Sequence, residues 1–110
     1  MTITDLVAQV EAAGHFAQAR NWAKLNGVEI AYGIDEDGSA KAPLIKVILD
    51  RKGRWILTVF GEVFYQAPSE GDVLTVALEL LRAMNECLDF SPEIVKKYGL
   101  VEMKASSIWT

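Results

Sequence analysis

The chain has 110 residues and a formal net charge of −4, and 51% of its residues are hydrophobic. This length accommodates one domain with a single core, so we expect residues 1–110 to form one domain. The negative charge argues against nucleic acid as a direct ligand, because a phosphate-binding surface would have to be built against the overall field. No apolar run approaches the roughly 20 residues that a membrane span needs, so no membrane segment is expected.

The N-terminus and the cysteine content bear on the cellular compartment. The first residues, MTITDLVAQV, have no basic segment followed by an apolar segment and a small-residue cleavage site, so no secretory signal is predicted. The single cysteine, Cys87, excludes an internal disulfide, which is typical of a protein in a reducing compartment. We therefore expect a cytoplasmic protein.

Helical patterns come first in the chain. Thr4 is a candidate N-cap residue. The apolar residues after it recur on one side at helical spacing: Leu6, Val7, Val10 and Ala13. Gly14 is expected to end this helix. In residues 16–25 the alanines favour a second short helix, and a hairpin around Asn26-Gly27 is the alternative; we predict the helix.

Strand patterns occupy residues 28–67. In VEIAYGI, residues 28–34, large apolar residues alternate with small or polar ones, which predicts a strand with one buried face. LIKVILD, residues 44–50, is a second strand. The segment DRKGR then reverses the chain, with Gly53 suited to the left-handed position of a short loop. Residues 44–50 should therefore pair antiparallel with the residues from Arg54 onward.

The stretch GRWILTVFGEVFYQA, residues 53–67, is typical of strand throughout but leaves no plainly polar face. Gly61 offers a bulge or a turn that would split it into two strands, which fits mean strand lengths of about five or six residues better than one long strand. Either arrangement leaves apolar side chains on both faces of the sheet. We expect helices over one face and a partner or a ligand over part of the other.

The C-terminal third predicts two helices. Ser69 and Asp72 form a Ser-x-x-Asp capping box, from which a long helix should run to about Leu88. Residues 91–93, Ser-Pro-Glu, are typical of a helix start, and Gly99 should end this shorter helix. The tail after Gly99 is either an edge strand or a surface segment.

The long helix is apolar over an arc of roughly 180°, against the ~100° that a one-sided surface helix needs. Leu78 lies outside even that arc. One explanation is a central helix flanked by the N-terminal helices. The other is a homodimer, since two-fold dimers are the commonest oligomers, and in that case Leu78 should lie in the dimer contact.

Strands bracketed by helical segments predict the α+β class rather than an alternating α/β order. We expect a small antiparallel sheet of three to five strands between about residues 28 and 67, with the N- and C-terminal helices packed mainly on one face. The connections between the strands are too short for parallel pairing.

Few residues point to catalysis. The chain has one histidine, His15, and one cysteine, Cys87, so a His/Cys zinc site cannot be assembled within it. No Gly-rich phosphate-binding motif occurs. We therefore expect no metal and no cofactor, and enzymatic activity is not favoured.

The sequence predicts a non-catalytic protein-interaction or accessory module that self-associates as a homodimer or binds a protein partner. Aromatic anchors dominate interface energetics, and core packing is their alternative role. The candidate interaction residues are Trp55, Phe64, Tyr65 and Leu78. The rival hypothesis is a small-molecule binder or small enzyme with an apolar pocket between sheet and helices. Its candidate polar groups are His15, Tyr32 and Glu62.

Overall fold

The computed structural model of the chain describes residues 2–31, 34–39, 44–59, 63–83 and 92–108. In these ranges it has three α-helices and one six-stranded antiparallel sheet, which confirms the α+β class. The sheet has more strands than the three to five expected, and it extends beyond residues 28–67 in both directions along the chain. Its strands are β1 (Phe16–Trp22), β2 (Leu25–Ala31), β3 (Leu44–Leu49), β4 (Trp55–Thr58), β5 (Phe64–Gln66) and β6 (Val101–Met103).

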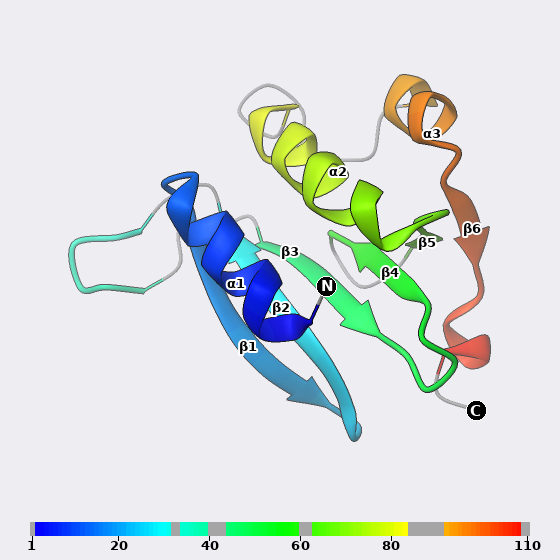
Figure 1. Ribbon diagram of the computed structural model, residues 1–110, viewed down its shortest axis with the longest axis horizontal. Helices are drawn as coiled ribbons and strands as arrows, with labels where there is room; N and C mark the ends of the chain where they lie inside the picture. The colour runs from blue at the N-terminus through cyan, green and yellow to red at the C-terminus, as the bar shows by residue number, and fades with distance from the viewer. Residues whose placement is uncertain (1, 32–33, 40–43, 60–62, 84–91, 109–110) are drawn as a thin grey trace.

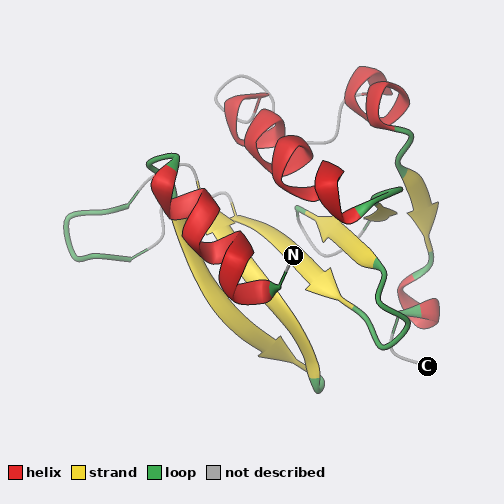
Figure 2. Cartoon of the chain, in the orientation of Figure 1, coloured by secondary structure: helices red, strands yellow, loops and turns green. Residues whose placement is uncertain are grey.

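The strands lie side by side in chain order, and each pairs antiparallel with the next (Figure 1). The helices are α1 (Ile3–Ala12), α2 (Glu70–Ala83) and α3 (Pro92–Tyr98), and a short 3₁₀ turn, η1 (Ala105–Ser107), follows β6. α1 contacts β1 and β2, whereas α2 contacts β4 and α3 (Figure 2). The chain thus forms two layers, a sheet and a layer of helices.

The helix-side core fills the space between these two layers. Successive residues of a strand point to opposite faces, so Ile30, Val47 and Leu57 point together toward the helices, where all three are fully buried. The apolar arc of α2 is used in the same core. Its buried residues are Val73, Val76, Ala77, Leu80 and Leu81.

A second apolar cluster covers part of the opposite face of the sheet. Its buried members are Leu25, Ile48, Ile56, Phe64 and Ile108, with Trp22 and Met103 packed against them. Ile108 follows η1, so the C-terminal segment of the chain lies against this face. Part of the second apolar side of residues 53–67 is therefore covered from within the chain, where we had expected a partner or a ligand.

The first helix begins earlier than predicted. Thr2, not Thr4, is the N-cap residue: the Asp5 N–H donates to Thr2 Oγ1 at 3.1 Å, and the Thr2 N–H donates to Asp5 Oδ2 at 2.9 Å. The bonds from Thr2, its backbone N–H first, lower the pKa of Asp5. Both threonines fit an N-cap pattern, but only Thr2 has an acid three residues later, as a capping box requires.

The predicted helix over residues 16–25 is wrong, because these residues form β1 and the turn that follows it. β1 pairs with β2 over seven consecutive residue pairs, from Phe16 opposite Ala31 to Trp22 opposite Leu25. The hairpin turn is at Ala23-Lys24, both with positive φ (49° and 70°), and not at the Asn-Gly pair. The helix propensity of three alanines is a weak preference that sheet pairing overrides.

The β3–β4 hairpin confirms the predicted pairing. Leu49 lies opposite Trp55, and Gly53 takes a φ of +78° in the loop. Residues 53–67 form two strands, β4 and β5, rather than one long strand, and Leu57 lies opposite Tyr65. Residues 60–62, which include Gly61, lie outside the described residues.

The C-terminal helices also begin near the predicted residues. Ser69 directly precedes α2 and Asp72 lies in its first turn, and the Ser69 hydroxyl donates to the Asp72 carboxylate at 2.7 Å. Residues 84–91, where the end of this helix was predicted, lie outside the described residues. α3 begins at Pro92, and Gly99 follows it with a φ of +63°. The tail forms β6, the edge-strand alternative.

A polar contact joins α2 to α3. The Tyr98 hydroxyl donates to the Glu79 carboxylate, and the Lys97 ammonium lies 3.3 Å from Glu79 Oε1. The Tyr98 bond, and then Lys97, lowers the pKa of Glu79 from its ordinary value of 4.5. Since the pKa is lower in the folded state, this contact contributes stability above pH 4.5 that is lost as the pH falls through the folded-state pKa.

We therefore expect Tyr98→Phe to raise the pKa of the Glu79 carboxyl toward 4.5, because the variant lacks the hydroxyl that favours the ionised form. NMR titration of the carboxyl carbon measures this directly. The stability difference between wild type and Tyr98→Phe should also shrink on acidification. Lys97→Met is the companion variant and should also raise this pKa, because it removes the ammonium group beside the carboxylate. An unchanged pKa in Tyr98→Phe would show that the contact does not form in solution.

Candidate functional site

The four predicted interaction residues do not share a surface. Trp55 is 5% exposed and belongs to the helix-side core, whereas Phe64 is 4% exposed and belongs to the cluster on the other face. Tyr65 and Leu78 are half-buried and pack against the helix-side core. For Trp55 and Phe64 the burial favours core packing, and a charge at Leu78 would be placed against the core of its own chain.

Of the three predicted pocket groups, only His15 lies in the described part of the chain. His15 is half-buried just after α1, where its backbone N–H donates to the Val10 carbonyl at 3.3 Å. Tyr32 and Glu62 lie outside the described residues. A pocket of about 260 Å³ lies between the β3–β4 loop, β5 and the start of α2, away from His15. Its polar lining residues are Arg54, Gln66, Ser69 and Glu70.

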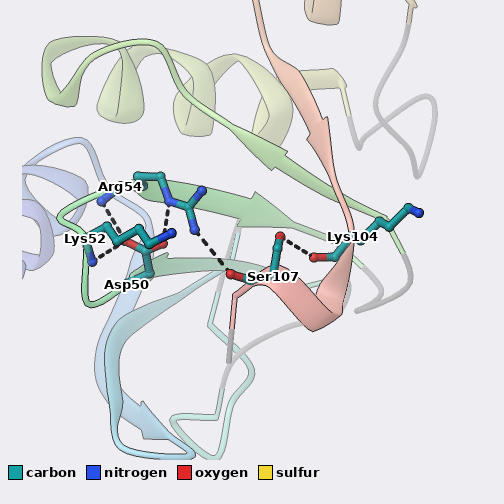
Figure 3. A network of polar contacts seen from close by, with 5 residues as sticks. All are labelled: Asp50, Lys52, Arg54, Lys104 and Ser107. Atoms are coloured by element: carbon teal, nitrogen blue, oxygen red, sulfur yellow. Dashed lines mark hydrogen bonds and ion pairs between the residues drawn. The ribbon is translucent and has the colours of Figure 1, made fainter. Parts of the chain in front are cut away.

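A polar network fastens the C-terminal segment to the β3–β4 loop (Figure 3). The buried Asp50 carboxylate accepts the backbone N–H groups of Lys52 and Arg54 at 3.0 and 2.8 Å, and the Arg54 Nε at 2.6 Å. Arg54 Nη2 then donates to the Ser107 carbonyl at 3.2 Å, and the Ser107 hydroxyl to the Lys104 carbonyl at 2.8 Å. Arg54 thereby holds η1 close to the sheet, beside the buried Ile108.

The β1–β2 hairpin is braced by Trp22 on the face opposite the helices. The Trp22 ring occupies the space beside Gly27 where a side chain would stand, and the Lys46 Nζ lies 5.6 Å from the ring centroid. Next to it, Arg20 Nε donates to Glu29 Oε2 at 3.1 Å, across from β1 to β2. All of these contacts join β1 to β2 or β3, so they hold β1 from the side that faces the rest of the sheet.

The hydrogen-bond alternation of the sheet identifies the β1 residues whose backbone N–H and C=O groups point outward, away from β2. In an antiparallel sheet the N–H and C=O of one residue point to the same neighbour, and successive residues alternate. The Asp50 N–H donates to the Arg54 carbonyl at 3.0 Å, so even-numbered residues of β3 bond to β4 and odd-numbered ones to β2. Carried through the register, this leaves three β1 residues with outward N–H and C=O groups: Ala17, Ala19 and Asn21.

The other edge of the sheet is protected. β6 has only three residues, and the Ala67 N–H donates to the Trp55 carbonyl at 2.9 Å, which sets the alternation there. Phe64 and Gln66 therefore bond to β6, and Glu102 alone turns its backbone groups outward. A short strand with an acidic outward residue is a common way to block further pairing. β1 has seven residues, an unbroken register, no proline and one charge, Arg20.

The sequence did not predict β1 as a strand with an open edge. Its residues, FAQARNW, show no apolar alternation, and the alanines favour helix. The aromatic residues at its ends, Phe16 and Trp22, were the available signal, since aromatic residues are enriched in strands.

Comparisons with known proteins add no family to this description. No family model, no curated protein and no solved structure matches the chain. Within the described ranges, no group of three or more His, Cys, Asp and Glu residues is placed to hold a metal ion. In those same ranges, no helix has both the length and the apolar character needed to cross a membrane.

Proposed function

We propose that this protein is a non-catalytic interaction module that associates with its own copies through the outer edge of β1. The observation that carries the proposal is the length and openness of this edge. In the described part of the chain no strand pairs with the outer side of β1, although the strand has seven residues. Unpaired N–H and C=O groups in a row are a template for another strand.

The distribution of charge also favours β1 over other parts of the chain as the place where a second copy binds. Each chain carries a formal net charge of −4, so two copies repel one another overall and a contact between them should avoid unpaired carboxylates. β1 has no acidic residue, and the nearby Glu29 is paired with Arg20 at 3.1 Å. By contrast, two copies of β6 would place Glu102 against itself.

Sedimentation equilibrium tests the proposal. Two seven-residue strands make a small interface, below the ~1,200 Å² of total buried area typical of stable complexes, so we expect weak and reversible association. The measured mass should rise from that of one chain at low micromolar concentration toward that of two chains as the concentration increases. A mass that stays at one chain up to a protein concentration of about 1 mM would overturn the proposal. The dissociation constant would then exceed about 1 mM, and the binding free energy would be weaker than about −4 kcal/mol.

A further inference from the structure

The alternation in β1 also restricts how two copies can pair. Only Ala17, Ala19 and Asn21 offer outward N–H and C=O groups, so a paired strand must place its own outward residues opposite these three. An antiparallel pairing with two-fold symmetry then has its axis on one residue of β1. The axis that pairs all seven residues of both strands lies on Ala19.

We propose that a second copy of this chain pairs antiparallel with β1 about a two-fold axis at Ala19, which joins two six-stranded sheets into one. Ala19 then lies opposite the second copy's Ala19, and Ala17 opposite the second copy's Asn21. Each of these pairs exchanges two hydrogen bonds. This inference rests on the proposed function and adds the register of the contact.

The side chains of β1 are compatible with this register. On the face opposite the helices, Phe16 lies opposite the second copy's Trp22, and aromatic cross-strand pairs are favourable. Arg20 lies opposite the second copy's Gln18, which can accept a hydrogen bond through its amide oxygen. On the helix side the opposed residues are Ala19 with itself and Ala17 with Asn21, which are small enough for the two strands to approach.

The neighbouring registers are less favourable. An axis at Arg20 would set two arginines directly opposite one another, and like charges in that position are destabilising. An axis at Gln18 would pair only residues 16–20 and leave Asn21 and Trp22 outside the contact. The Ala19 axis therefore combines the longest pairing with the absence of a like-charge pair.

Disulfide trapping tests the register. In a Cys87→Ala background, Ala19→Cys alone should form a covalent dimer under a mild oxidant, because hydrogen-bonded pairs have Cα atoms about 5.5 Å apart, within disulfide range. Ala17→Cys and Asn21→Cys should each stay largely monomeric alone but cross-link when mixed. Cross-linking of Ala17→Cys mixed with Ala19→Cys would indicate the Gln18 axis instead, and would overturn this register.

Ala19→Pro tests the edge without depending on cysteine geometry. The Ala19 N–H points outward, so proline there leaves the β1–β2 bonds intact and is tolerated at an edge. We expect the thermal midpoint to change little and the dimer dissociation constant to rise at least about tenfold, since two central hydrogen bonds are lost. Gln18→Pro, whose N–H bonds to β2, should instead unfold more easily.

The outcomes separate the register from the function. A dimer that is weakened by Ala19→Pro but is cross-linked through Ala17→Cys mixed with Ala19→Cys would reject the Ala19 register while the β1 contact stands. A dimer that persists in Ala19→Pro and is not trapped by any of the cysteine variants would reject the β1 contact, and with it the proposed function. A single-chain mass at every concentration would reject both.

Discussion

Gly27→Ala should lower the free energy of unfolding by about 3 kcal/mol, the upper end of the cost of forcing extra atoms into a packed site. A Cβ at Gly27 would stand 2.5 Å from the Val47 carbonyl oxygen and against the Trp22 ring. The ring could turn away, but the backbone oxygen of the neighbouring strand cannot. In a domain of this size the change corresponds to a fall in Tm of roughly 10–20 °C, measurable by calorimetry.

Two variants control for this expectation. Gly71→Ala changes a glycine in α2 where the new Cβ would lie 3.8 Å from the Ser69 hydroxyl oxygen, an ordinary van der Waals distance, so it should cause no loss and a gain of up to about 1 kcal/mol. In a Trp22→Ala background, Gly27→Ala should cost less than it does in the wild type but should still destabilise, because the Val47 oxygen remains. If Gly27→Ala melts at the wild-type temperature, the hairpin does not pack as described.

Asp50→Ala should cost about 2–3 kcal/mol in the free energy of unfolding. The Asp50 side chain is 2% exposed and accepts three hydrogen bonds, one of them from the Arg54 guanidinium. Removing it leaves two backbone N–H groups of the β3–β4 loop without this acceptor. It also frees Arg54 to leave the Ser107 carbonyl, so hydrogen exchange in residues 105–108 should become faster. Chemical denaturation and exchange mass spectrometry measure the two effects.

Asp37→Ala is the matched control for Asp50→Ala. Asp37 also accepts a backbone N–H two residues later, from Ser39 at 3.0 Å, but it lies in an exposed turn. Its removal should leave the denaturation midpoint nearly unchanged and the exchange of residues 105–108 as in wild type. Equal effects of the two substitutions would mean that burial of Asp50 does not matter.

The sequence predicted those elements whose signals are local. Gly53 takes the left-handed φ of the β3–β4 loop, and Pro92 and Gly99 bracket α3, because each conformation depends mainly on the residue itself and its nearest neighbours. The α+β class followed from the order of such signals. The exception was the N-cap, where Thr2 and Thr4 both fit and the acid at Asp5 decided for Thr2.

The elements that local signals did not predict depend on contacts between distant residues. β1 is a strand because β2 pairs with it over its whole length, against the helix preference of its alanines. The candidate site was missed for the same reason, since the outward backbone groups of Ala17, Ala19 and Asn21 are defined only once the pairing of four strands, β1 to β4, is known.

The sequence by itself determined the secondary-structure class, the β3–β4 turn and the amount of apolar surface that the chain must cover. Only the tertiary structure decided what covers it. The Arg54 bond to the Ser107 carbonyl joins the C-terminal segment to the β3–β4 hairpin, although the two residues are 53 positions apart in the chain. Ile108 is buried against the same face of the sheet. Apolar surface is not directional, so the sequence specifies that it must be buried, and the geometry of the folded chain selects the segment that buries it.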